Sequence, residues 1–91
     1  MNETPFHHYG EDGALYSIDV IRDRRDEANP HYDVDLVRLM TGRFGESIEQ
    51  RLTLGEHDER GDADVHRDEL ERAMQEQGLN GVGNAKERIL K

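Results

Sequence analysis

The sequence contains no cysteine among its 91 residues and has no long hydrophobic run. The lack of cysteine excludes disulfide bonds, thiolate catalysis and cysteine-based zinc sites. No apolar run approaches the roughly 18–20 residues that cross a bilayer. The first ten residues also lack the basic and apolar segments of a signal peptide. We therefore expect a cytoplasmic protein that does not associate with membranes.

Hydrophobic residues are scarce, at 33% of the chain against 36% charged residues. A chain of this length forms one domain and buries roughly 60–65% of its surface. We expect residues 1–13, which have little apolar content, to be a flexible N-terminal tail. Residues 14–91 then form a single small α+β domain, which has a modest core or completes its core in a homodimer.

Basic residues are outnumbered by acidic ones, 12 to 21, and the formal net charge is −9. A field of that sign repels nucleic-acid backbones and suits a partner protein with a basic surface. An alternative is that the acidity serves only solubility or a salty habitat. The excess is densest over residues 55–76, where nine acidic residues face three arginines.

The first half of the chain predicts three strands. Tyr16, Ile18 and Val20 alternate with polar residues over residues 14–22, as in a half-buried strand. Residues 31–41 and 47–54 fit either a strand or a helix. Pro30 and two valines favour a strand for the first, and the short connection over residues 42–46 favours an antiparallel meander.

Residues 62–77 are the clearest predicted helix. His66, Leu70, Ala73, Met74 and Gln77 fall at helical spacing and form one narrow stripe. Asp62 or Asp64 is expected to cap the first turn, and Gly78 to end the helix. The predicted fold is a three-stranded antiparallel meander packed by this helix and by a short C-terminal helix. The alternative is an all-helical fold after residue 33.

An acidic interaction surface is the first candidate site. Carboxylates along a loop and a helix are able to imitate a phosphate backbone and to bind proteins that normally hold nucleic acid. The alternative is a solvated helix face without a partner. The surface comprises Asp58, Glu59, Asp62, Asp64, Asp68, Glu69, Glu71 and Glu76.

The C-terminal segment is the second candidate site. Leu79, Gly81, Val82, Gly83, Ala85, Lys86, Ile89 and Leu90 follow a helix and begin another. This pattern, over residues 79–90, resembles the helix-hairpin-helix motif of nucleic-acid-binding proteins, although Asn80 stands where that motif usually has proline. The resemblance implies that Gly81, Val82 and Gly83 hold a phosphate with help from Lys86. The alternative is a plain structural turn.

The remaining candidates point away from catalysis. His57 and His66 flank a loop and could converge on a metal ion, but acidic residues at a helix start also serve as caps. Ser17 and Ser47 lie in no sharp-turn motif with a nearby base. We therefore expect no catalytic residue, no metal and no cofactor. The predicted function is a non-enzymatic protein-interaction module, accessory or inhibitory, with a small nucleic-acid-binding domain as the alternative.

Overall fold

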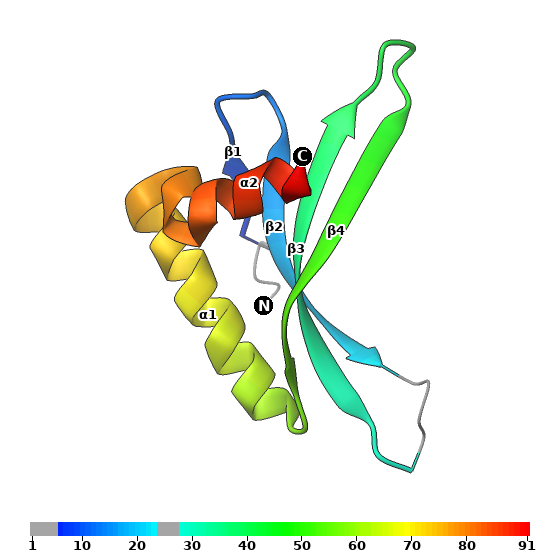
Figure 1. Ribbon diagram of the computed structural model, residues 1–91, viewed down its shortest axis with the longest axis vertical. Coiled ribbons are helices and arrows are strands. Elements are labelled where there is room, and N and C mark those ends of the chain that lie inside the picture. The colour runs from blue at the N-terminus through cyan, green and yellow to red at the C-terminus, as the bar shows by residue number, and fades with distance from the viewer. Residues whose placement is uncertain (1–5, 24–27) are drawn as a thin grey trace, which may run out of the picture.

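The computed structural model describes residues 6–23 and 28–91, which form one antiparallel sheet followed by a bent helical segment (Figure 1). The strands lie side by side in chain order: β1 (His8–Tyr9), β2 (Leu15–Asp23), β3 (His31–Thr41) and β4 (Ser47–His57). The helical segment comprises α1 (Arg60–Gln77), the 3-10 helix η1 (Gly78–Val82) and α2 (Gly83–Leu90). Over residues 6–23 and 28–91, no helix has the length and apolar character needed to cross a membrane.

The predicted α+β class is confirmed, and both ambiguous segments are strands. The sheet also has a short fourth strand, β1, inside the segment expected to be a flexible tail. Residues 1–5 of that tail lie outside the described residues, as do residues 24–27 between β2 and β3.

The predicted capping of α1 is half right. Gly78 ends the helix as expected, with a positive φ of 65° that glycine adopts without strain, but its ψ of −146° lies outside the left-handed helical region. The expected cap by Asp62 or Asp64 is wrong, because the helix begins at Arg60, and the N-cap residue Glu59 makes no side-chain capping bond. Asp62 lies instead within the first turn, where its charge still complements the positive end of the helix dipole.

One face of the sheet, here called the covered face, packs against α1. The alternation expected for β2 is correct, since Tyr16 and Ile18 are buried there. Ile18 lies opposite Leu36 of β3, and Val20 lies opposite the buried Val34. Fully burying such a side chain contributes about 1.5–3 kcal/mol. The helices supply the other side of the core with the buried residues Ala63, Met74, Leu79, Val82 and Ala85. On the opposite face, here called the open face, no helix formed by residues 6–23 and 28–91 packs against the sheet.

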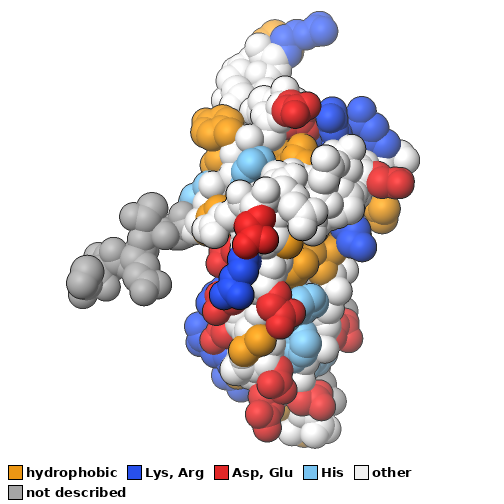
Figure 2. All heavy atoms as spheres, turned by 90° about the vertical axis from the view of Figure 1, so that its left-hand side faces the viewer, with side chains coloured by type: hydrophobic (Ala, Val, Ile, Leu, Met, Phe, Trp, Pro, Cys, Tyr) orange, Lys and Arg blue, Asp and Glu red, His pale blue; other side chains and the backbone are white. Residues whose placement is uncertain are grey.

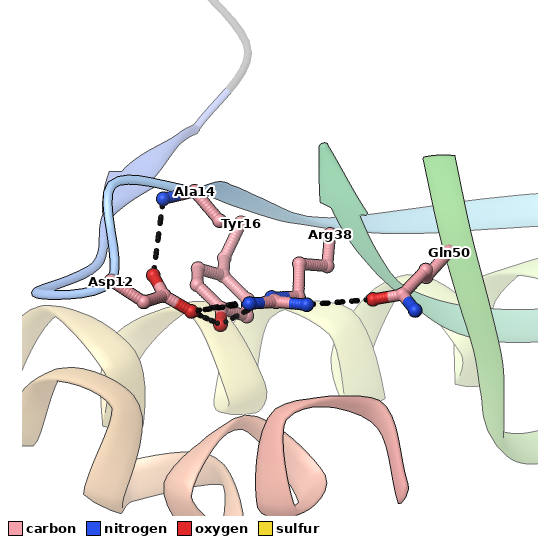
Figure 3. A network of polar contacts seen from close by, with 5 residues as sticks. All are labelled: Asp12, Ala14, Tyr16, Arg38 and Gln50. Carbon is pink, nitrogen blue, oxygen red and sulfur yellow. Dashed lines mark hydrogen bonds and ion pairs between the residues drawn. The ribbon is translucent and has the colours of Figure 1, made fainter. Parts of the chain in front are cut away.

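A buried polar network ties the turn between β1 and β2 to the middle of the sheet (Figure 3). The guanidinium of Arg38 donates to Asp12 at 2.8 Å and to Gln50 at 2.8 Å, and the Tyr16 hydroxyl donates to Asp12 at 2.6 Å. Burial alone would raise the pKa of Asp12, but bonds from Tyr16, the Ala14 amide and Arg38 lower it to about 2. The carboxylate is therefore stabilised in its charged form.

We predict that Asp12→Asn lowers the free energy of unfolding at pH 7 by about 2–4 kcal/mol, because Arg38 loses its buried counter-charge. The folded pKa is depressed, so the contribution of Asp12 is complete above its unfolded pKa of 3.8 and is lost as pH falls toward 2. Urea titrations from pH 7 to pH 2.5 should show the two proteins converging.

Asp19→Asn is the matched control for this substitution. Asp19 pairs with Arg51 on the open face and its side chain is 42% exposed, so its loss should change stability by less than about 1 kcal/mol. Equal losses in the two variants would contradict a special role for the buried network.

The last turns of the chain have an unusual backbone. Residues 84–90 all have positive φ, from 45° to 58°, which is the left-handed helical region. For L-amino acids this conformation costs roughly 1–2 kcal/mol per residue. Over seven residues the cost is on the order of 10 kcal/mol, which is comparable with the whole stability of a small domain.

We therefore expect residues 84–90 to adopt the right-handed helical conformation in solution, since the same residues reach it without this cost. Residual dipolar couplings and φ-dependent three-bond couplings, measured by NMR, check the sign of φ at each position. Positive φ throughout the segment in solution would overturn this expectation.

Candidate functional site: an edge-strand groove

The outer edge of β2 is open over most of its length. Within the described residues, β1 pairs only with Leu15 and Tyr16, so residues 17–22 have a strand partner only on the β3 side. The amide of Gly10 donates to the carbonyl of Ala14 at 2.9 Å, so that carbonyl points toward the β1 side. Because backbone groups alternate along a strand, those of Ile18, Val20 and Arg22 also point to the open edge.

A groove with a volume of about 580 Å³ lies along this edge. One wall consists of residues 17–21 of β2, and the other comes from the middle of α1. The lining residues are Phe6, His7, Ser17, Ile18, Asp19, Val20, Ile21, Arg51, Arg67, Asp68 and Glu71. The groove thus combines unpaired backbone groups with apolar and charged side chains.

Arg51 of β4 is the centre of the charged cluster on the open-face side of the groove. Its guanidinium lies 3.2 Å from Asp19, 3.6 Å from Asp35 and 3.2 Å from Glu49. Thr53 donates a further hydrogen bond to Asp35 at 2.8 Å. One cation is therefore shared by three carboxylates, which leaves an excess of negative charge beside the strand edge.

Arg67 of α1 repeats this arrangement on the helix side of the groove. Its guanidinium lies 3.4 Å from Asp64, 3.4 Å from Asp68 and 4.0 Å from Glu71. Burial raises the pKa of Glu71, the charge of Arg67 opposes the shift, and Asp68 adds to it. The groove is therefore bounded on both sides by carboxylate-rich clusters, although Asp64 also pairs with Arg60 at 3.9 Å.

The structure divides the eight residues of the predicted acidic surface. Asp64, Asp68 and Glu71 surround Arg67 at the groove. Figure 2, which views the α1 side, shows red acidic side chains dispersed among blue basic, pale-blue histidine and uncharged ones. The other five residues are exposed and lie just before α1 or along it: Asp58, Glu59, Asp62, Glu69 and Glu76.

The four residues that the helix-hairpin-helix resemblance assigns to phosphate binding do not share one surface. Val82 is buried, and Gly81 packs so closely on α1 that an added Cβ would lie 2.1 Å from the Ala73 carbonyl oxygen. Gly83 and Lys86 are exposed. The close approach of two helical segments thus accounts for Gly81 without a phosphate.

His57 and His66 do converge, as their positions beside one loop suggested. His57 Nε2 lies 3.0 Å from His66 Nδ1, so one ring donates a hydrogen bond to the other. His66 reaches this position above Gly55, where an added Cβ would come within 2.7 Å of the imidazole. In this arrangement each imidazole uses one ring nitrogen to bind the other ring.

The edge groove was missed at the sequence level. The strand itself was predicted, but whether an edge is open depends on which segment pairs beside it, and β1 covers only two residues. Two features of the sequence pointed to this site. Asp19 is a charged residue within the apolar alternation of β2, and Arg51 and Arg67, which are far from it in the chain, each have acidic residues nearby.

No protein-family model, curated protein or solved structure matches this chain. A functional proposal therefore depends on the geometry of the site.

We predict that Arg67→Ala raises the pKa of Glu71 further, because Arg67 supplies the charge that opposes the effect of burial. A ¹³C NMR titration of the Glu71 carboxyl group measures the change. Arg60→Ala is the control, since the Arg60 side chain is 71% exposed and its described ion pair is with Asp64. An unchanged Glu71 titration in Arg67→Ala would contradict this account of the cluster.

Proposed function

We propose that this protein is an interaction module that binds an extended, basic segment of a partner protein as an additional strand on the edge of β2. The observation that carries the proposal is the coincidence of an unpaired strand edge with a groove between that strand and α1. Strand addition of this kind obtains affinity from main-chain hydrogen bonds and specificity from pockets for alternate side chains.

The backbone geometry supports strand addition. Ile18, Val20 and Arg22 present a regular row of donors and acceptors, spaced two residues apart. Exposed edges of this kind readily pair with another chain. The groove beside the row has room for side chains of an added strand, with α1 as its second wall.

Charge supports a basic occupant. Three carboxylates surround the single guanidinium of Arg51, and three more share Arg67 and, at Asp64, Arg60. Carboxylates outnumber arginines in both clusters, so cationic side chains in the groove would meet an excess of negative charge. A basic partner is favoured over a second copy of this chain, because two molecules with a net charge of −9 repel one another. Of the eight acidic residues that the sequence predicts as an interaction surface, this proposal uses three: Asp64, Asp68 and Glu71.

A designed peptide tests the proposal. The probe alternates lysine and threonine over about eight residues, a length that spans residues 17–22 at roughly 3.3 Å per residue. We expect saturable binding that weakens with added salt, and amide shift changes in ¹H–¹⁵N NMR spectra at residues 17–22 and 67–71. A peptide of the same length with glutamate in place of lysine should not bind.

Two substitutions at Val20 separate backbone pairing from side-chain contact. Val20→Pro removes the outward N–H, while the neighbouring residues still pair with β3, so we expect about tenfold weaker peptide binding. Val20→Ala loses a similar amount of packing but keeps the N–H, and its affinity should stay within about threefold of the original. Equal peptide affinities in the two variants would contradict the proposal. If the protein formed a homodimer and Val20→Pro dissociated it, the edge would bind a second copy of the chain, which would also contradict the proposal.

A further inference from the structure

A second group of polar side chains lies on the open face, where β2 ends and β3 begins. Asp23 and His31 are direct partners in the antiparallel register, and Asp33 follows His31 on the same face. His31 Nε2 lies 3.1 Å from Asp23 Oδ2 and 3.6 Å from Asp33 Oδ1. One donor atom from each residue lies within 4.8 Å of the other two.

One oxygen of the Asp33 carboxylate lacks a hydrogen-bond donor. Its Oδ1 atom is buried and has no hydrogen-bond partner among the described residues. The distance of 3.6 Å to His31 Nε2 is too long for a hydrogen bond. A buried carboxylate oxygen without a donor is costly, so a native structure normally supplies a water molecule or an ion.

Several carboxylates also gather around Asp33. The carboxylate of Asp23 lies beside that of Asp33, and Asp35 follows Asp33 on the same face of β3. Glu56 is the direct cross-strand partner of Asp33 on β4, so it lies beside the same group of donors. A bound cation would offset this negative charge.

We propose that Asp23, His31 and Asp33 bind a divalent first-row transition-metal ion, for which zinc is the representative probe. Two carboxylates and one imidazole form a mixed oxygen and nitrogen ligand set, and the imidazole favours such ions over magnesium and calcium. Two ligand atoms bound to zinc at about 2.0–2.2 Å with tetrahedral angles lie roughly 3.3–3.6 Å apart. The observed separations of 3.1 and 3.6 Å are close to this requirement.

The site is independent of the peptide-binding proposal. It uses side chains at the β2–β3 end of the open face, whereas the groove uses the backbone edge of β2 and the side chains of α1. Metal binding is measured without a peptide, so either proposal can fail while the other stands.

Isothermal titration calorimetry with zinc, on the full chain after treatment with a chelator, tests the site. We expect one saturable site that millimolar magnesium does not displace, and Co²⁺ bound in its place should give visible d–d absorption. Mn²⁺ should selectively broaden the amide signals of residues 23, 31 and 33 in NMR spectra of the unaltered protein. This last measurement needs no variant and therefore does not depend on whether a substitution preserves folding.

Substitutions then assign the ligands. His31→Gln and Asp33→Asn should each weaken zinc binding at least about tenfold, with circular dichroism confirming that both proteins remain folded. His57→Gln is the matched control, because it alters a histidine of the other imidazole cluster, and it should leave the affinity within about twofold. Absence of saturable zinc binding would overturn the proposal. Loss of binding in His57→Gln but not in His31→Gln would assign zinc to the imidazole pair and would also overturn it.

Discussion

A shortage of apolar side chains is the constraint on which the rest of this structure depends. Hydrophobic residues make up 33% of the chain, and the core that they form lies between one face of the sheet and one helical segment. A second helix layer would need another apolar stripe, which the chain does not have. Polar and charged residues therefore occupy much of the open face and the edges, and both proposed sites lie there.

Some charged side chains are buried and fully paired, and these stabilise the fold. Others lie nearer the surface in clusters where carboxylates outnumber arginines, and these form the proposed binding site. Arg38 and Asp12 form a buried pair whose remaining bonds are met by Tyr16 and Gln50, so the group is satisfied within the molecule. Arg51 and Arg67 are each shared by three carboxylates and lie nearer the surface. An excess of like charge that the fold does not neutralise is available to a cationic side chain or a metal ion.

The two proposed sites lie close together on β2 but use different parts of it. The groove depends on backbone groups of β2 that have no strand partner among residues 6–23 and 28–91, where β1 comprises only two residues. The metal site depends on side chains that the β2–β3 register places opposite one another. The same pairing of β2 with β3 therefore holds both sites, and the burial of Ile18 against Leu36 keeps that register in place.

The sequence by itself determined the α+β class, the buried face of β2 and the end of α1 at Gly78, because alternation, helical spacing and the glycine backbone are local properties. Tertiary structure alone decided that β1 joins the sheet, that the edge of β2 stays open, and that Asp23, His31 and Asp33 converge. It also divided the acidic residues near α1 between the groove and the outer surface. These features depend on strand register and on distances between segments far apart in the chain, and local residue patterns do not encode them.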